Sequence, residues 1–300
     1  MARSLVRGWR CCGLVPEWIR RSQERGLPET TTERRGKPAF RLILVMNAND
    51  VKMEDAKQVT KDMIKECLLS LGIAEGDTVF FHSSLKSIGH VVSGADTVID
   101  AFLETLGNSG TLVLPALCEW GNMGREAIKK AWDIQTTPTL TGLIPETLRK
   151  RHGSLRSDNP THSVTAVGRY ASEITKEHKR AHGGEWVANR PRWASHGAFG
   201  ENSPWDKLYL LDAKYMFIGV DFSCCTMLHH VQVLLLENYL RKTDSNASWP
   251  TFGFGWMGQK LEDLGLVRIG KIGGAVTRLI STRSLVDTAI GVLREEGYDR

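Results

Sequence analysis

The chain has 300 residues, of which 41% are hydrophobic and 24% charged, and this composition is typical of a globular protein. It contains no run of about 18 apolar residues, so the sequence predicts no membrane-spanning helix. The net charge of +5 is concentrated in residues 1–45, which carry a net charge of +6, whereas the remainder carries −1. This distribution argues against nucleic acid or a membrane surface as a partner of the body of the chain.

The first 52 residues differ from the rest by their richness in arginine. We interpret residues 1–52 as a basic, disordered extension or as sequence upstream of a true start, and residues 53–300 as a single domain. A transit peptide is the alternative, although four glutamates within this segment disfavour it. The six cysteines form no C-x-x-C pair, which suits neither a disulfide framework nor a zinc site. We therefore expect a cytoplasmic protein without a structural metal.

Helical and strand patterns alternate from Thr60 onward. Apolar periodicity and flanking glycines or prolines predict helices over 60–71, 95–106, 143–151, 226–241 and 284–296. Short apolar, β-branched runs predict strands over 78–82, 111–114, 163–167, 214–220 and 275–280, with Pro115 ending the second. Strands separated by helices indicate an α/β sheet with helices on its faces.

Polar residues follow three of these strands. They form the segments HSSLKSIG at 82–89, PALCE at 115–119 and DFSCCT at 221–226. Ligands bind outside the carboxyl ends of strands in open α/β sheets, so we expect these segments to outline one site if they are neighbours. The first segment offers hydroxyls, a lysine and backbone N–H groups that suit an anion, although an ordinary polar turn is the alternative.

The turn that leads into the predicted helix at 226–241 carries two adjacent histidines. His229 and Gln232 are three residues apart and share a helix face, and Thr226 is a candidate N-cap. The helix dipole disfavours an imidazolium at this position, so His229 is a candidate general base. The alternative is a core histidine with satisfied hydrogen bonds.

Other motifs predict less. The segment GFGWMG at 253–258 matches G-x-G-x-x-G, but no clear strand precedes it, which argues against a dinucleotide site. His178 and His182 are four residues apart without the glutamate of a zinc motif, so we expect them on the solvated surface. The adjacent Cys224 and Cys225 are interpreted as apolar filler; a hydrolase using one of them with His229 is a remote alternative.

Four segments, taken in order, resemble the aminoglycoside 3-N-acetyltransferase family. They are HSSLKSIG, GADTVIDAFLETLGNSGTLVLP, NPTHSVTAVG and FGENSPWDKLYLLDAKYMFIGVDFSCCTMLHH, and the similarity covers roughly residues 57–298. The resemblance implies a central mixed sheet flanked by helices, in an α/β fold distinct from the common GNAT fold of acetyltransferases. It also implies acetyl-CoA as the acetyl donor and a small-molecule amine as the acceptor.

The resemblance further implies roles for individual residues. Coenzyme A is expected to contact the first loop at His82, Ser83, Ser84, Leu85, Ser87 and Ile88, and a second segment at Thr161, His162 and Ser163. Thr226 and His229 match the family's T-x-L-H-x-x-E stretch, in which the histidine takes a proton from the attacking amine. Acidic residues are expected around a cationic acceptor, and the candidates are Glu119, Asp133 and Asp221.

The chain departs from the family pattern at one position, because Gln232 stands where the family has a carboxylate. A glutamine can orient the histidine ring but supplies no charge. Another acid would have to supply it, with Asp221, Glu119, Glu201 and Glu237 as candidates. The departure leaves three interpretations open: an aminoglycoside acetyltransferase, an acetyltransferase for another amino sugar, and a coenzyme A-binding protein that has lost catalysis. A monomer or a homodimer is expected.

Overall fold

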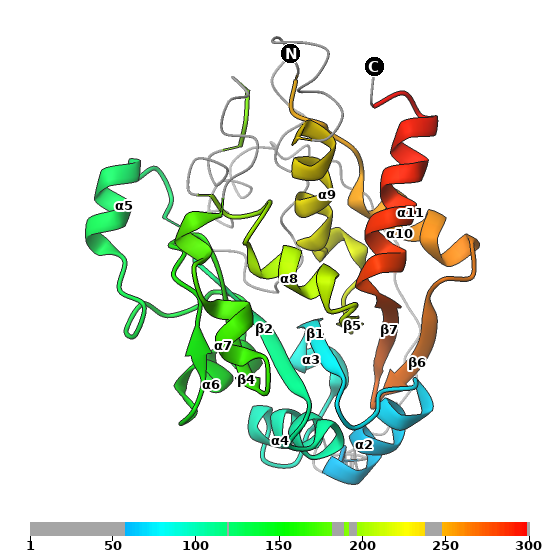
Figure 1. Cartoon of the computed structure of the whole chain (residues 1–300). Coiled ribbons are helices and arrows are strands. Elements are labelled where there is room, and N and C mark those ends of the chain that lie inside the picture. The colour runs from blue at the N-terminus through cyan, green and yellow to red at the C-terminus, as the bar shows by residue number, and fades with distance from the viewer. Residues whose placement is uncertain (1–57, 119, 182–188, 192–196, 238–247, 299–300) are drawn as a thin grey trace, which may run out of the picture. The chain divides into compact units, whose positions relative to one another are not determined.

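A computed structural model describes residues 58–118, 120–181, 189–191, 197–237 and 248–298 (Figure 1). These residues belong to one compact unit. The extension predicted at 1–52 lies outside them and stays a prediction. None of the helices in the described part of the chain has both the length and the apolar character needed to cross a membrane.

The described strands form one seven-stranded mixed sheet in the order β3-β4-β2-β1-β5-β7-β6. Their bounds are β1 Thr78–Ser83, β2 Thr111–Leu117, β3 Leu155–Arg156, β4 His162–Gly168, β5 Lys214–Ile218, β6 Arg268–Ile272 and β7 Ala275–Ser281. The central strands β2, β1 and β5 are parallel, and β4 and β7 flank them in the antiparallel direction. The sheet confirms the predicted fold class.

Helices cover both faces of this sheet. Their bounds are α2 Lys61–Ser70, α3 Leu85–Ile88, α4 Ala95–Leu106, α5 Arg125–Ala131, α6 Leu143–Lys150, α7 Ala171–Thr175, α8 Pro204–Leu210, α9 Met227–Leu235, α10 Phe254–Asp263 and α11 Thr282–Glu295, with short 3₁₀ turns η1 at His178–Arg180 and η3 at Phe222–Cys224. Buried residues of α2, α4 and α6 share one core, and those of α7 to α11 share the other.

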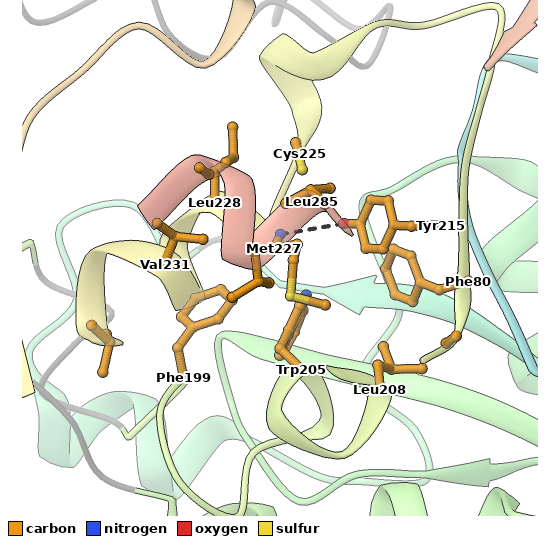
Figure 2. Close-up of a cluster of buried hydrophobic side chains, with 14 of the residues drawn as sticks. Phe80, Phe199, Trp205, Leu208, Tyr215, Cys225, Met227, Leu228, Val231 and Leu285 are labelled. Atoms are coloured by element: carbon orange, nitrogen blue, oxygen red, sulfur yellow. Dashed lines mark hydrogen bonds between the residues drawn. The ribbon is translucent and has the colours of Figure 1, made fainter. Parts of the chain in front are cut away.

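The two cores follow from the alternation of side chains along the central strands. Phe80 of β1 faces the core beneath α7 to α11, while its neighbours Val79 and Phe81 face the opposite core. Phe80 stacks on Tyr215 of β5 with ring centroids 4.7 Å apart. Figure 2 shows this first core, with Met227 of α9 lying close to Trp205 and Phe199. Strands β1 and β5 are therefore buried on both faces, and their carboxyl ends lie at the same edge of the sheet.

The predicted end of the strand at 111–114 is wrong, because β2 continues through Pro115 to Leu117. Cys118, just after β2, donates its N–H to the Thr161 carbonyl, so the N–H of Cys118 points toward β4. Successive residues of an antiparallel strand point their backbone N–H groups alternately toward the partner strand and away from it. The backbone nitrogen of Pro115, three residues before Cys118, therefore points away from β4 and toward β1. The pairing of β2 with β1 ends at Val113, so no hydrogen bond from position 115 is needed there.

Candidate active site

The polar segments that follow β1 and β5 lie side by side, as the sequence predicts. Ser83 pairs with Ile218 in the ladder between these strands, and the N–H of Ser84 donates to the Ile218 carbonyl at 2.9 Å. The Ser87 hydroxyl then donates to the Gly219 carbonyl at 3.2 Å. On the other side, Leu117 at the end of β2 pairs with His162 at the start of β4. The edge of the sheet thus brings the predicted segments together.

His229 lies in the first turn of α9, just beyond this edge. Its Nδ1 lies 2.7 Å from Oε1 of Gln232, one helical turn further along. Among the described residues, three aromatic rings surround the imidazole, with centroids at 4.8 Å for Phe254, 5.5 Å for Phe199 and 6.3 Å for His162. Burial lowers the pKa of His229 to about 4, against the opposing effect of the Gln232 hydrogen bond. The imidazole is therefore neutral at pH 7, as a general base requires.

Gln232 is almost fully buried, and both the oxygen and the nitrogen of its side-chain amide have hydrogen-bond partners. Its Oε1 faces His229, and its Nε2 donates to the Pro250 carbonyl at 2.5 Å. Pro250 is itself buried and precedes α10, the helix that carries Phe254. The glutamine thus links α9 to the chain leading into α10 and fixes one edge of the His229 ring.

Thr226 and His82 lie beneath the first turn of α9 in one buried hydrogen-bond network. The Thr226 hydroxyl accepts from Nε1–H of Trp205 at 3.0 Å and lies 3.1 Å from the Tyr215 hydroxyl. His82 Nε2 lies 2.9 Å from the Tyr215 hydroxyl and 3.2 Å from that of Thr226. Tyr215 also accepts from the Met227 N–H at 3.3 Å, drawn as a dashed line in Figure 2. Thr226 occupies the predicted N-cap position of α9, but its side chain makes no capping hydrogen bond and accepts from Trp205 instead.

The predicted anion-binding loop is a compact turn around the short helix α3. The Ser84 hydroxyl caps this helix by accepting from the Ser87 N–H at 3.3 Å, and it lies 2.9 Å from the Ser87 hydroxyl. Ile88 is buried in the core, Ser83 and Leu85 are half-buried, and Lys86 and Ser87 are exposed. Gly219 permits the close approach of the two loops, since a Cβ there would lie 2.3 Å from that of Ser87. Lys86 is thus the exposed charged donor of this loop, whereas the Ser84 and Ser87 hydroxyls are engaged with each other and with the Gly219 carbonyl.

The second predicted segment is organised by Asn159, a residue that the sequence analysis did not select. Its Oδ1 accepts from the N–H groups of Thr161 at 3.0 Å and His162 at 2.9 Å. The Thr161 hydroxyl donates to the same oxygen, and that of Ser163 donates to the Ala116 carbonyl at 2.7 Å. Of the three predicted residues, His162 is the one whose ring approaches His229. An asparagine before a proline is a turn signal that could have identified this anchor.

The described acidic candidates for acceptor binding are engaged within their own turns. Asp133 is exposed and accepts from the N–H groups of Gln135 and Thr136, and these hydrogen bonds lower the pKa of its carboxyl. Asp221 is exposed and caps η3 by accepting from the Ser223 N–H at 2.9 Å. Glu119 lies outside the described residues. The described partner of His229 Nδ1 is the neutral amide of Gln232.

The sequence analysis also missed the aromatic surroundings of His229. Phe199 precedes α8 without a periodic pattern, and Phe254 lies inside the segment that was assessed as a dinucleotide motif. That segment begins α10 and not a βαβ unit. The surface placement predicted for His178 is wrong: it is fully buried, with Nδ1 2.8 Å from the Ser157 hydroxyl and Nε2 2.9 Å from the Ala198 carbonyl. His182 lies outside the described residues.

Cys225, which directly follows the η3 turn, offers no activated thiol. Cys225 is buried, and burial raises the pKa of its thiol to about 12. A thiol in such a position stays protonated at neutral pH. Within the described ranges, no group of three or more histidine, cysteine or acidic side chains is arranged to hold a metal ion.

Comparison with known proteins connects this geometry to a family. The family model described as aminoglycoside 3-N-acetyltransferase matches residues 80–294. A prophage-derived aminoglycoside N(3')-acetyltransferase-like protein, YokD, of Bacillus subtilis is 29% identical over 77% of this chain and 90% of its own length. Aminoglycoside N(3)-acetyltransferase VII of Streptomyces paromomycinus is 25% identical over 79% of this chain and 92% of its own length.

Solved structures share the fold. The crystal structure of the Bacillus subtilis YokD protein superposes with a TM-score of 0.63 at 27% identity, covering 79% of this chain and 93% of that one. A complex of the enzyme AAC-IIIb with CoASH superposes with a TM-score of 0.65 at 22% identity, covering 80% of this chain and 97% of that one. Because the family model spans most of the chain and includes β1, β5 and the His229 turn, the chain belongs to the aminoglycoside 3-N-acetyltransferase family.

Proposed function

We propose that this protein transfers the acetyl group of acetyl-CoA to an amino group of an aminoglycoside or a related amino sugar, with His229 as the general base. The observation that carries the proposal is the neutral imidazole of His229, held by Gln232 at the edge of the sheet where the predicted segments meet. Relatives named as aminoglycoside N(3)-acetyltransferases and a related structure with CoASH support the same donor and class of acceptor.

The residues at the carboxyl end of β1 fit the polar part of coenzyme A. Lys86 and Ser87 are exposed, and Gly89 has open space where a side chain would stand. The ammonium group of Lys86 is a donor that suits phosphate oxygens. His82 and Thr226 hold neighbouring parts of the site in place and do not bind coenzyme A directly, because each side chain is already hydrogen-bonded within the buried network. Bound acetyl-CoA would supply an activated acyl group and a thiol leaving group.

His229 performs the proton transfer in this scheme. The amine nitrogen forms the new bond to the acyl carbon, and a ring nitrogen of His229 accepts the proton that the amine loses. The protonated His229 then gives up this proton, and the departing sulfur takes it and leaves as the free thiol, which returns the imidazole to its neutral form. No protein nucleophile is needed, which agrees with the inactive setting of Cys225. Gln232 keeps the imidazole in one orientation while the proton is transferred.

The identity of the acceptor is tested by free-thiol release from acetyl-CoA. Purified protein is given a 4,5-disubstituted aminoglycoside, a 4,6-disubstituted aminoglycoside or a mono-amino sugar, and the products are checked by mass for one added acetyl group. We expect release that depends on an aminoglycoside. Release with the mono-amino sugar alone would move the acceptor to another amino sugar, an alternative favoured by the engagement of Asp133 and Asp221 in their own turns.

The donor site is tested separately by calorimetric titration with coenzyme A. Ser84→Trp places a bulky ring at the start of α3 and is expected to weaken coenzyme A binding. Binding without thiol release to any amine would identify a protein that has lost catalysis. Unchanged affinity in Ser84→Trp would remove this loop from the donor site.

A further inference from the structure

The amide of Gln232 contacts the backbone carbonyl of Pro250 as well as the ring of His229. Position 232 carries an amide whose two ends face different partners, His229 Nδ1 at 2.7 Å and the Pro250 carbonyl at 2.5 Å. A backbone carbonyl accepts hydrogen bonds and never donates them. The amide atom that faces Pro250 must therefore be the NH₂ group, and the amide oxygen must face His229.

This orientation determines the state of the histidine. An amide oxygen is also an acceptor only, so His229 Nδ1 must carry a proton to bond with it. In the neutral imidazole, Nε2 then holds the lone pair. We propose that the Pro250 carbonyl, acting through Gln232, locks His229 in the Nδ1–H tautomer and makes Nε2 the nitrogen that accepts the proton. The inference rests on the proposed role of His229 as base, and Gln232 and Pro250 are its positioning groups.

The same contact explains why position 232 holds an amide and not a carboxylate. A glutamate there would bring an acceptor oxygen against the acceptor oxygen of Pro250, in a place where Gln232 is only 5% exposed. Such a carboxyl group must either take up a proton to donate to Pro250 or turn away from it. In the first case it supplies no negative charge to His229, and in the second the ring loses its fixed partner. The site is thus built for a neutral partner.

The test reads the tautomer directly and does not need activity. The protein is labelled with ¹⁵N, and the two ring nitrogens of His229 are identified by their loss in His229→Ala. At pH 7 the wild type is expected to show a protonated Nδ1 and an unprotonated Nε2. A protonated Nε2 with an unprotonated Nδ1 would overturn the inference, because the amide would then have to be reversed. Failure of the proposed function would instead appear as acetyl transfer that does not depend on His229.

Two substitutions at position 232 sharpen the test. Gln232→Met keeps the length of the side chain but removes both hydrogen bonds, and it should leave His229 as a mixture of tautomers. A displaced or wrongly protonated base is expected to lower kcat by about a hundredfold. Gln232→Glu should also lose activity near pH 7. An increase in kcat for Gln232→Glu would contradict the inference.

A matched control separates these effects from the chemical change itself. Gln58→Glu makes the same substitution at an exposed position, and it should leave both the His229 signals and kcat unchanged. Circular dichroism identifies any variant at position 232 that fails to fold, in which case the wild-type tautomer alone decides the inference.

Discussion

Thr226 is engaged in buried hydrogen bonds beneath the first turn of α9. Its hydroxyl is surrounded by Trp205 Nε1, the Tyr215 hydroxyl and His82 Nε2, at 3.0, 3.1 and 3.2 Å. Trp205 can only donate and therefore fixes the hydroxyl as an acceptor on that side. The network holds the start of α9, three residues before His229, against strands β1 and β5.

We predict that Thr226→Val destabilises the protein although valine has nearly the same shape. The substitution leaves the Trp205 N–H buried without its acceptor, which costs about 1–3 kcal/mol in the free energy of unfolding. Thr226→Ser keeps the hydroxyl and serves as the comparison. Urea denaturation measures both variants, and equal midpoints for Thr226→Val and wild type would show that the network contributes nothing.

At the scale of elements, α10 depends on a glycine for its approach to η3. A Cβ at Gly258 would lie 2.4 Å from Cβ and Cγ of Phe222, a side chain that is buried. A Cβ at Gly255, one turn earlier in the same helix, would have no neighbouring side chain within 4 Å. The glycines of this segment therefore have different roles, one in packing and one without a steric demand.

We predict opposite effects of alanine at these two glycines. Gly258→Ala forces α10 away from Phe222 and is expected to cost about 1–3 kcal/mol in unfolding free energy. It should also lower kcat, because Phe254 of α10 packs on His229. Gly255→Ala is expected to gain up to about 1 kcal/mol, since alanine favours helix and meets no neighbour. Chemical denaturation distinguishes the two, and equal destabilisation would refute the packing role of Gly258.

Elements with strong periodicity were predictable, and those defined by tertiary contacts were not. The helix at Ala95–Leu106 was predicted with its observed bounds because its apolar stripe and Gly107 mark it clearly. The edge strand Arg268–Ile272 was missed because it carries two basic residues and a glycine and is mostly exposed. The extension of β2 through Pro115 depends on which strand lies beside it, and no local pattern contains that information.

In the candidate site, too, some features were predictable from the sequence and others depend on tertiary contacts. Chain order and residue type predicted His229, Gln232 and the loop after β1 as candidates. The partner of Gln232 is a backbone carbonyl, and the rings of Phe199 and Phe254 come from separate segments. Neither kind of contact leaves a pattern in the sequence, because each depends on how distant segments pack.

The buried histidines His82, His178 and His230 and the half-buried His229 make the stability of the whole molecule depend on pH. Burial lowers the pKa to about 3 for His82, His178 and His230, and to about 4 for His229. The unfolded chain takes up these protons near pH 6.5, whereas the folded protein does not. The stabilisation is therefore complete above pH 6.5 and is lost as the pH falls toward 3.

We predict a lower urea midpoint at pH 5 than at pH 7. Each of these histidines contributes up to about 1.4 kcal/mol per pH unit in this window. Carboxylates with a lowered pKa, such as Glu146 at about 2, begin to contribute only below pH 4.5. Denaturation curves at the two pH values check the effect, and identical midpoints would mean that the histidines are accessible to protons in the folded state.

The most direct test of the central claim is the rate of amine-dependent thiol release from acetyl-CoA by the wild type and His229→Ala. His152→Ala, at an exposed histidine in the turn after α6, is the matched control. We expect His229→Ala to lose roughly 10²- to 10⁴-fold in rate, the usual contribution of a general base, while His152→Ala retains the wild-type rate. An unchanged rate in folded His229→Ala would contradict the assignment of His229 as the base.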